Sequence, residues 1–137
     1  DVTLLCPTPE YVLDSRYMDF ARHNVAESGG SLRVSHDIEA SYRDADVVYA
    51  KSWGALPYFG NWGPEKPIRD QFKHFMVDEA KMALTRNGVF SHCLPLRRNI
   101  KATDAVMDAP YCIAIDEAEN RLHVQKAVMA GMLEWSR

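Results

Sequence analysis

The chain has few of the features that mark disulfide-rich, metal-binding or membrane-spanning proteins. Its three cysteines, Cys6, Cys93 and Cys112, are odd in number and lack the close spacing of disulfide or zinc motifs. No apolar run approaches the roughly eighteen residues that cross a bilayer, and no secretory leader is visible. A net charge of −3 favours neither nucleic acid nor an anionic membrane as a partner. We therefore expect a protein of the reducing cytoplasm.

Two further features that the sequence lacks bear on its class of function and on whether it is a whole protein. No Gly-x-Gly-x-x-Gly element follows any expected strand, which counts against a nucleotide-dependent oxidoreductase. The chain also lacks an initiating methionine and begins at Asp1 inside a strand pattern. We therefore expect it to be a piece of a longer protein.

The rest of the sequence alternates strand and helix patterns, as βαβ units do. Strands are expected at Val2–Cys6, Leu32–His36, Asp46–Ala50, from Val89 onward and at Tyr111–Ile115. Helices are expected at Glu10–Glu27, Asp37–Tyr42, Val77–Leu84, Thr103–Met107 and Asp116–Trp135. Asp37 and Thr103 are expected to cap their helices, the glycines after Ser28 to end the first helix with a left-handed cap, and Asp116–Glu119 to form a capping box. The apolar spacing of the first helix places Tyr17 and Phe20 on its inward face. A hydrophobic content of 47% in 137 residues suits one domain, residues 1–137. The alternation predicts the α/β class, a Rossmann-like three-layer sandwich with a mostly parallel sheet.

Between Ala55 and Pro67 the sequence is rich in proline, glycine and aromatic residues and shows no clear period. Connections of this length without structure of their own are usually functional or disordered. The aromatic content favours a binding loop or lid.

The segment His92–Pro95 (HCLP) ends an apolar strand, at the edge where an open α/β sheet binds its ligands. His92 and Cys93 point to opposite faces of a strand, so His92 cannot readily activate the thiol. A cysteine-protease or redox-enzyme role is therefore not expected. If the bond from Leu94 to Pro95 is cis, the Leu94 carbonyl has a fixed direction and can accept a hydrogen bond from a ligand amino group. The alternative is a purely structural role, with His92 as a core histidine beside the buried thiol of Cys93.

Two other strand ends carry polar groups. Lys51, Ser52 and Trp53 follow the third strand, and Arg121 is expected in the first turn of the terminal helix, where a cation opposes the helix dipole. Each has an ordinary structural explanation, as a snorkelling lysine, a half-buried tryptophan or a solvated arginine. Because the carboxyl ends of parallel strands meet at one edge, the coincidence favours a small-molecule site.

The HCLP segment, the following Arg97 and Arg98, and the later run from Asp116 to Ala127 (DEAENRLHVQKA) resemble the second domain of the ornithine/aspartate carbamoyltransferases. In the ornithine enzymes of that family, an acidic residue and a Ser-Met-Gly element after the third strand hold a free α-ammonium group. This chain has Lys51 there, which suits a substrate with an acylated α-amine and a free carboxylate. The resemblance is therefore to the branch that acts on N-acetyl-L-ornithine, with the N-succinylornithine branch as the alternative.

The resemblance implies transfer of a carbamoyl group from carbamoyl phosphate to the δ-amine of N-acetyl-L-ornithine, in arginine biosynthesis, without a metal or other cofactor. It implies that the Leu94 carbonyl and Arg121 hold the carbamoyl group. It also implies that Cys93 lies beside the attacking amine and that Lys51 binds the substrate carboxylate. The other residues implied to line the site are Ser52, Trp53, His92 and Pro95.

Lys101 follows Arg97 and Arg98 closely, and neighbouring cations lower the pKa of a lysine. A neutral lysine can take up CO2 as a carbamate, whose negative charge pairs with arginines. We therefore consider carboxylation of Lys101, with a solvated basic turn as the alternative.

The resemblance also indicates what is missing. The family's first domain carries a phosphate-binding Ser-x-Arg-Thr loop that has no counterpart here. The first, central strand of the second domain is missing together with its helix, so Val2–Cys6 and Asp46–Ala50 should lack their shared neighbour. We expect a gap there, or a partner that supplies the strand, and an inactive isolated chain. The family also implies a homotrimer.

A different class of function remains open on the sequence. A non-catalytic Rossmann-like module could bind an acidic amino-acid metabolite with the same strand-end groups.

Overall fold

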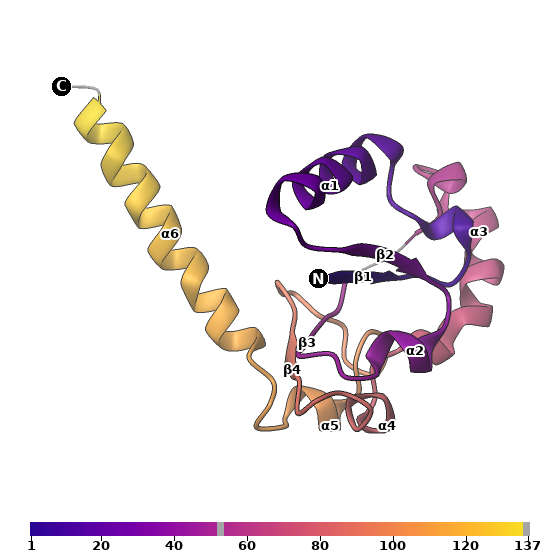
Figure 1. Ribbon diagram of the computed structural model, residues 1–137. Coiled ribbons are helices and arrows are strands. Elements are labelled where there is room, and N and C mark those ends of the chain that lie inside the picture. Colours follow the sequence, from indigo (N-terminus) through magenta and orange to yellow (C-terminus); the bar gives the residue numbers. More distant parts are fainter. Residues whose placement is uncertain (52–53, 136–137) are drawn as a thin grey trace.

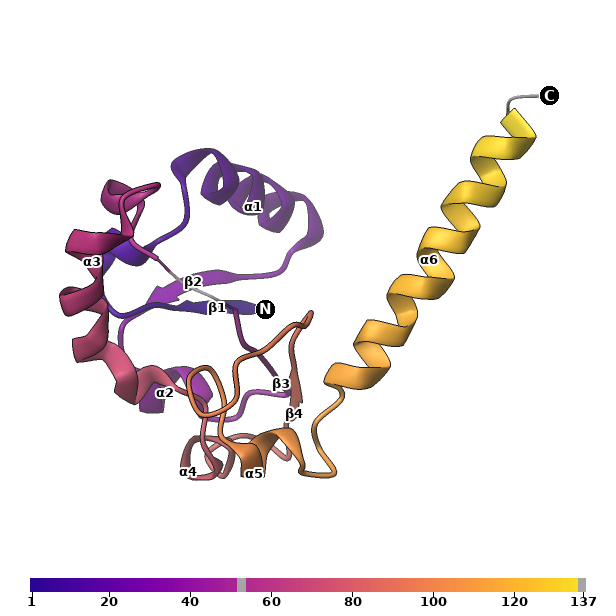
Figure 2. The same ribbon diagram turned by 180° about the vertical axis from the view of Figure 1, so that it is seen from behind.

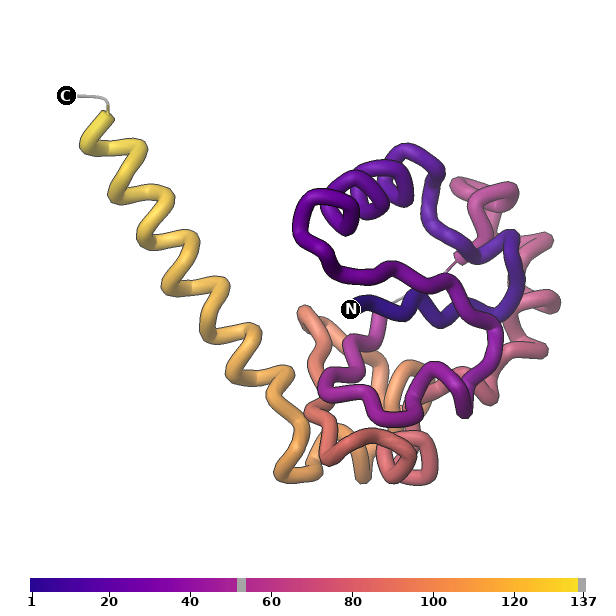
Figure 3. Tube along the Cα trace, viewed as in Figure 1, coloured from indigo at the N-terminus to yellow at the C-terminus, as the bar shows by residue number. Residues whose placement is uncertain are grey.

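The computed structural model describes residues 1–51 and 54–135 and confirms an α/β domain (Figure 1). The strands are β1 (Val2–Leu5), β2 (Leu32–Ser35), β3 (Val47–Tyr49) and β4 (Val89–Ser91). The helices are α1 (Ser15–Ser28), α2 (Ile38–Tyr42), α3 (Trp62–Arg69), α4 (Glu79–Met82), α5 (Asp104–Met107) and α6 (Ala114–Trp135). Short 3₁₀ helices lie at Pro9–Tyr11, Leu56–Tyr58 and Asp70–Phe75. The Cα trace in Figure 3 shows α6 leaving a body formed by all the other elements.

The strands form two separate parallel pairs, β1 with β2 and β3 with β4. Isolated parallel bridges outside these strands include one that joins Phe90 to Cys112. The Phe90 N–H donates to the Tyr111 carbonyl at 2.9 Å, and the Ile113 N–H donates to the Phe90 carbonyl at 2.9 Å. The expected strand at Tyr111–Ile115 is therefore wrong beyond this bridge, because α6 begins at Ala114 and ends the extended conformation.

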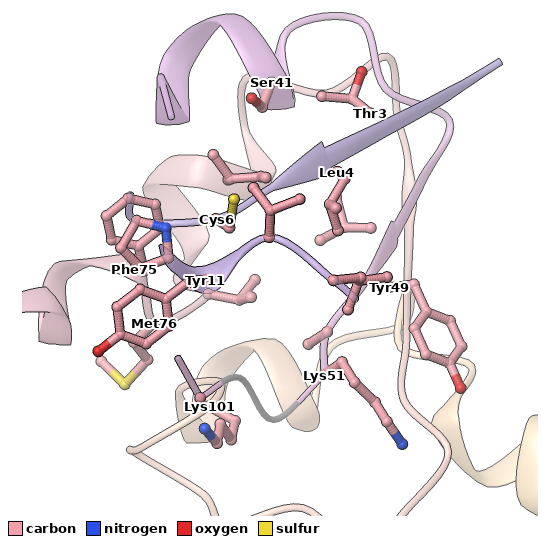
Figure 4. A pocket seen from close by; sticks show the side chains of 18 of the residues that line it. Thr3, Leu4, Cys6, Tyr11, Ser41, Tyr49, Lys51, Phe75, Met76 and Lys101 are labelled. Carbon is pink, nitrogen blue, oxygen red and sulfur yellow. The ribbon is translucent and has the colours of Figure 1, made fainter. Parts of the chain in front are cut away.

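The gap expected between the first and third strands is confirmed, because β1 and β3 share no ladder in the part of the chain that the structure describes. A largely apolar pocket of about 450 Å³ lies there instead, lined by residues of both strands (Figure 4). Both β1 and β3 therefore present one edge to this pocket rather than to a neighbouring strand.

The main hydrophobic core forms where β4 packs against α2, α4 and α5. Phe90 is fully buried at its centre. The buried side chains packed with it are Tyr42, Val77, Met82, Ala102 and Val106. A smaller cluster of Cys6, Tyr11 and Ala55 packs at the carboxyl end of β1. Cys6, just beyond β1, and Phe90 and Ser91 of β4 are thus anchored by burial.

The first helix starts later than the sequence pattern predicted. The expected range Glu10–Glu27 is replaced by a 3₁₀ helix and then α1, because the Asp14 carboxylate accepts the Arg16 N–H at 2.9 Å and caps the helix there. The helix ends at Gly29, whose φ of 73° gives the left-handed cap that the sequence indicated.

The buried face of α1 also differs from the expected one. The apolar spacing pointed to Tyr17 and Phe20 as inward residues, yet both are more than half exposed and Met18 is buried instead. A single helix packed on one side of a two-stranded sheet has little apolar surface to cover, so periodicity alone did not identify its inner face.

Residues Ala55–Pro67, expected to be irregular, contain a 3₁₀ helix and most of α3. Two features allow a helix in this proline-rich stretch. Pro64 lies in the first turn, where no intrahelical N–H bond is lost. The buried Glu65 accepts the Ala55 N–H at 2.7 Å and pairs with Arg69 at 3.3 Å, which ties the helix to the preceding turn.

Caps read from the sequence are confirmed at two shorter helices. Asp37 accepts the Ala40 N–H at 3.0 Å at the start of α2. Thr103 accepts the Val106 N–H at 3.2 Å at the start of α5. The expected helix Val77–Leu84 is shorter, because Asp78 caps α4 only at Glu79.

The terminal helix α6 begins at Ala114, so the expected capping box from Asp116 to Glu119 is wrong. Asp116 and Glu117 lie within its first turn, where carboxylates favour the helix dipole. Seen from behind in Figure 2, α6 again projects away from the other elements. None of the helices described is both long and apolar enough to cross a membrane.

We predict that Phe90→Ala lowers the free energy of unfolding by about 3–5 kcal/mol, because it leaves a cavity in the main core. The matched control is Phe59→Ala, since Phe59 is 81% exposed whereas Phe90 is 0% exposed. The control should lose less than about 1 kcal/mol. Urea unfolding followed by circular dichroism measures both, and equal losses would contradict the placement of the core.

Candidate functional site

The site lies where β3 and β4 end. Their register places Tyr49 opposite Ser91, and the ladder continues one step further, because the Ala50 N–H donates to the Ser91 carbonyl at 3.1 Å. Lys51 and Cys93 each lie just past the end of their strand, after Ala50 and His92 respectively. The parallel register therefore brings both residues to the same edge, as the sequence analysis expected.

Lys51 and Cys93 are in direct contact. The Lys51 ammonium donates a hydrogen bond from Nζ to Cys93 Sγ at 3.0 Å. This hydrogen bond stabilises the thiolate form and is the largest cause of the lowered pKa of Cys93. Lys51 is exposed and Cys93 is half-buried, so both remain within reach of a small molecule. Ser52 and Trp53, predicted with Lys51, lie outside the described residues.

Glu117 joins the two strands to α6, and the sequence analysis missed this role by assigning the residue to a capping box. The Tyr49 hydroxyl donates to Glu117 Oε1 at 2.8 Å, and the Ser91 hydroxyl donates to Oε2. These two hydrogen bonds lower the pKa of Glu117, and the bond to its carboxylate raises the pKa of Tyr49. No local pattern marks such a partner, because the three residues lie on three different elements.

The HCLP turn is held by its own histidine. The bond from Leu94 to Pro95 is cis, and Leu94 has a positive φ of 45°. The Leu94 N–H donates to His92 Nδ1 at 2.9 Å. Within residues 1–51 and 54–135, no donor is paired with the Leu94 carbonyl. The backbone N–H is thus satisfied internally while the carbonyl is open to a ligand.

His92 is buried, and it is neutral at physiological pH. Burial lowers its pKa, and the positive charge of Lys51 adds to the effect, while Glu117 partly opposes it. A neutral ring is required for Nδ1 to accept the Leu94 N–H. His92 therefore supports the turn rather than facing the pair of Lys51 and Cys93.

Arg121 is not brought into contact with Lys51, Cys93 or Leu94. It lies in the second turn of α6, not the first, because the helix begins at Ala114. Its side chain is exposed, and it forms no ion pair with any described residue. Of the four residues expected to converge, three lie at one edge and Arg121 stands apart on the projecting helix.

Lys101 is half-buried, and Figure 4 shows it with Lys51 along the same side of the pocket. Burial lowers its pKa first, and Arg97 and Arg69 lower it further. Arg98, expected to share in this effect, is instead paired with Asp108 at 2.6 Å and Asp104 at 3.0 Å. The basic cluster around Lys101 therefore consists of Arg97 and Arg69.

In the described part of the chain, no group of three or more His, Cys, Asp or Glu residues is placed to hold a metal ion. The strand-end arrangement instead suits an anionic or amide-bearing small molecule. It offers an ammonium group and a thiol in direct contact at the ends of β3 and β4, with the Leu94 carbonyl on the residue after the thiol.

Parallel strand pairs flanked by helices, with these polar groups at the strand ends, define a small-molecule-binding α/β domain. The chain belongs to the aspartate/ornithine carbamoyltransferase family, because the model of that family's Asp/Orn binding domain matches residues 1–132. The resemblance read from the HCLP segment and the terminal helix is confirmed.

The relatives are close in sequence and structure. The chain is 80% identical over all 137 residues to an N-acetylornithine carbamoyltransferase of Xanthomonas campestris, of which it covers 40%. A crystal structure of acetylornithine transcarbamylase complexed with acetylcitrulline is 82% identical, with a TM-score of 0.92 over 96% of this chain and 39% of that one. A mutant N-acetyl-L-ornithine transcarbamylase complexed with carbamyl phosphate and N-succinyl-L-norvaline also gives 82% identity and a TM-score of 0.92, over 96% of this chain and 40% of that one. The chain thus spans about 40% of the length of the relatives it matches.

The lowered pKa of His92 predicts a loss of stability in acid. As the pH falls below 6.5, the unfolded state binds a proton at His92 before the folded state does. The free energy of unfolding should therefore fall more steeply below this pH in the parent than in His92→Asn, whose Oδ1 can accept the Leu94 N–H without titrating. Urea titrations at several pH values measure both slopes, and parallel slopes would contradict a neutral buried His92.

Proposed function

We propose that this chain is the amino-acid-binding part of an N-acetylornithine carbamoyltransferase. The neutral δ-amine of N-acetyl-L-ornithine attacks the carbonyl carbon of carbamoyl phosphate, the bond from that carbon to the phosphate oxygen breaks, and N-acetyl-L-citrulline and phosphate are released. The observation that carries the proposal is the Lys51 ammonium against Cys93 at the ends of β3 and β4. It is supported by 80% identity to an enzyme of that name.

Lys51 supplies the charge that recognises the substrate. Acylation removes the positive charge of the α-amine and leaves the α-carboxylate as the charged group at that end of the molecule. An exposed ammonium at a strand end forms a charge-assisted hydrogen bond with such a carboxylate. The same ammonium would repel the free α-ammonium group of unmodified ornithine, so one residue both attracts the acylated substrate and disfavours the other.

The carbamoyl group is assigned to the HCLP turn. The Leu94 carbonyl accepts a hydrogen bond from the carbamoyl –NH2 group. Cys93 lies beside the attacking δ-amine, and Arg121 holds the carbamoyl oxygen. Assigning Arg121 this role requires a substrate or a neighbouring part of the protein to close the distance from α6. Catalysis then rests on positioning and on stabilisation of developing charge rather than on a covalent intermediate.

The remaining proposed substrate-binding residues, which complete the pocket around the carboxylate and the turn, are Ser52, Trp53, His92 and Pro95. Among them His92 acts through the backbone, since it holds the Leu94 N–H.

The other half of the site is proposed to lie outside this chain. A carbamoyl-phosphate-binding domain would supply the phosphate contacts, and three copies of the whole protein would form a homotrimer. We place the activity in the cytoplasm, within arginine biosynthesis. Such additional structure would cover the projecting α6 and the edges of β1 and β3 that pair with no strand among the described residues.

Two alternatives stay open. N-succinylornithine is a second candidate substrate, since a mutant of a solved relative is complexed with N-succinyl-L-norvaline. A non-catalytic module would bind an acidic metabolite at Lys51 without carbamoyl phosphate. Calorimetry separates the two classes, because an enzyme of this kind should bind N-acetylornithine more tightly with carbamoyl phosphate present, whereas a module should be indifferent to it.

We predict that Lys51→Met lowers kcat/KM for N-acetylornithine about 10- to 100-fold, the value of one hydrogen bond to a charged group. Lys51→Asp should lower it further, because a carboxylate repels the substrate carboxylate. The activity is measured in a chimera in which this chain replaces the matching 137 residues of the Xanthomonas campestris relative.

The matched control for this experiment is Lys73→Met, which removes a lysine whose side chain is 78% exposed and paired only loosely with Asp70, at 3.7 Å. It should leave kcat/KM within about twofold of the parent chimera. Undiminished use of N-acetylornithine by Lys51→Asp would refute carboxylate recognition by Lys51.

We also propose that Lys101 is carboxylated. Its lowered pKa leaves more neutral amine, which adds to CO2 with loss of a proton, and the resulting carbamate would be held by Arg97 and Arg69. With ¹³C-labelled bicarbonate, we predict one carbamate resonance in the carbon NMR spectrum. It should be absent from Lys101→Arg and present in Lys81→Arg, whose lysine is paired with Asp78. Loss from both variants, or from neither, would reject the assignment.

A further inference from the structure

Cys93 stands apart from the other two cysteines in its surroundings. Its sulfur accepts a hydrogen bond from Lys51 Nζ at 3.0 Å, and the side chain is half-buried at an open strand end. Cys6 is buried, and burial raises its pKa. Cys112 is half-buried beside the bridge to Phe90 and has no lysine among its hydrogen-bond partners in the described residues. Cys6 and Cys112 therefore serve as controls within the same chain for the effect of Lys51 on the Cys93 thiol.

We propose that Lys51 and Cys93 form an oxidation-sensitive pair, in which a hydroperoxide converts the two side chains into a reversible sulfur–nitrogen cross-link. This modification is distinct from the proposed transferase reaction. The cross-link itself depends only on the contact between the two side chains, whereas its effect on activity rests on the proposed function.

The first step makes a sulfenic acid. The Cys93 thiolate attacks one oxygen of hydrogen peroxide, the oxygen–oxygen bond breaks, and the departing oxygen takes a proton from the Lys51 ammonium and leaves as water. Sulfur is oxidised and the peroxide is reduced. The products are Cys93–SOH, a neutral Lys51 amine and one water molecule.

The second step uses the amine that the first has released. The Lys51 nitrogen attacks the sulfur, the sulfur–oxygen bond breaks, and the hydroxyl leaves as water with one proton from nitrogen. Sulfenic acids condense with nitrogen in this way to form sulfenamides. Across both steps, one thiol, one amine and one peroxide give the cross-link and two waters.

The geometry favours this outcome over further oxidation. The nitrogen is already 3.0 Å from the sulfur, and the two residues follow neighbouring strands whose ladder fixes their separation. The charged and titratable groups that face the thiol are Lys51, Tyr49 and Glu117. The Glu117 carboxylate already accepts hydrogen bonds from the hydroxyls of Tyr49 and Ser91.

The cross-link would disable the site. It replaces the Lys51 ammonium by an uncharged nitrogen tied to sulfur, and it removes the thiol that the proposed function places beside the attacking amine. A thiol reductant cleaves the sulfur–nitrogen bond and restores both side chains. The result is a reversible switch at the substrate-binding edge.

The decisive experiment uses the 137-residue chain, one equivalent of hydrogen peroxide and peptide mass spectrometry without reductant. We expect a peptide pair joined through Lys51 and Cys93, two hydrogens lighter than its two parts, together with lost trypsin cleavage after Lys51. Both changes should reverse with dithiothreitol. Cys93 should react at least about tenfold faster than Cys6.

Two variants test the role of Lys51. In Lys51→Arg the cation remains but the guanidinium is a poor nucleophile, so Cys93 should be trapped by dimedone as sulfenic acid without a cross-link. In Lys51→Met the oxidation of Cys93 should slow toward the rate of Cys112. Absence of the joined peptide in the parent, or equal oxidation rates at the three cysteines, would overturn the proposal.

A parallel measurement on the chimera keeps the two proposals apart. Peroxide should inactivate a working transferase, and dithiothreitol should restore it. A chimera that is inactive before any peroxide would count against the transferase assignment alone. A cross-link that is absent from an active chimera would count against the switch alone.

Discussion

The parallel pairing of β3 with β4 is the constraint on which the candidate site depends. The two strands are only three residues long, yet their ladder sets Lys51 beside Cys93 and allows Glu117 to reach both Tyr49 and Ser91. The same β4 carries Phe90, the buried centre of the main core. Packing and function therefore share one element, and a shift of register by one residue would turn Phe90 outward as it separated the functional side chains.

At the ends of β3 and β4, charge and hydrogen bonds, rather than apolar packing, hold the polar side chains in place. Lys51 faces a thiol whose pKa it lowers, and Glu117 is held in its charged form by two hydroxyl donors. His92 lies on the buried side and stays neutral, because burial and the nearby Lys51 both oppose its protonation. Because the two faces of this strand end differ in environment, the adjacent residues His92 and Cys93 have different roles. His92 accepts a hydrogen bond from a backbone N–H, and Cys93 contacts the Lys51 ammonium.

The same domain leaves much apolar surface uncovered. β1 and β3 each present an edge to a pocket of about 450 Å³, and α6 carries exposed residues such as Leu122, Met129 and Trp135 along a projecting helix. Edge strands and apolar helix faces are normally covered in a folded protein. Together with a coverage of about 40% of each relative, these surfaces support the proposal that further structure completes both the sheet and the site.

The sequence by itself determined the features that depend on local chemistry: the α/β class, the caps at Asp37 and Thr103, the glycine end of α1 and the family signature of the HCLP turn. Each follows from residues close together in the chain. It also indicated the missing strand, through the resemblance. It did not determine the start of α1 or of α6, or the helix within residues 55–67. These depend on which competing cap or buried contact prevails.

Only the tertiary structure decided the partners of Glu117, the separation of Arg121 from the other expected residues, and the replacement of Arg98 by Arg69 near Lys101. Each pairs groups from elements far apart in sequence. Such pairings arise from strand register and helix placement, which the pattern of a single segment does not specify.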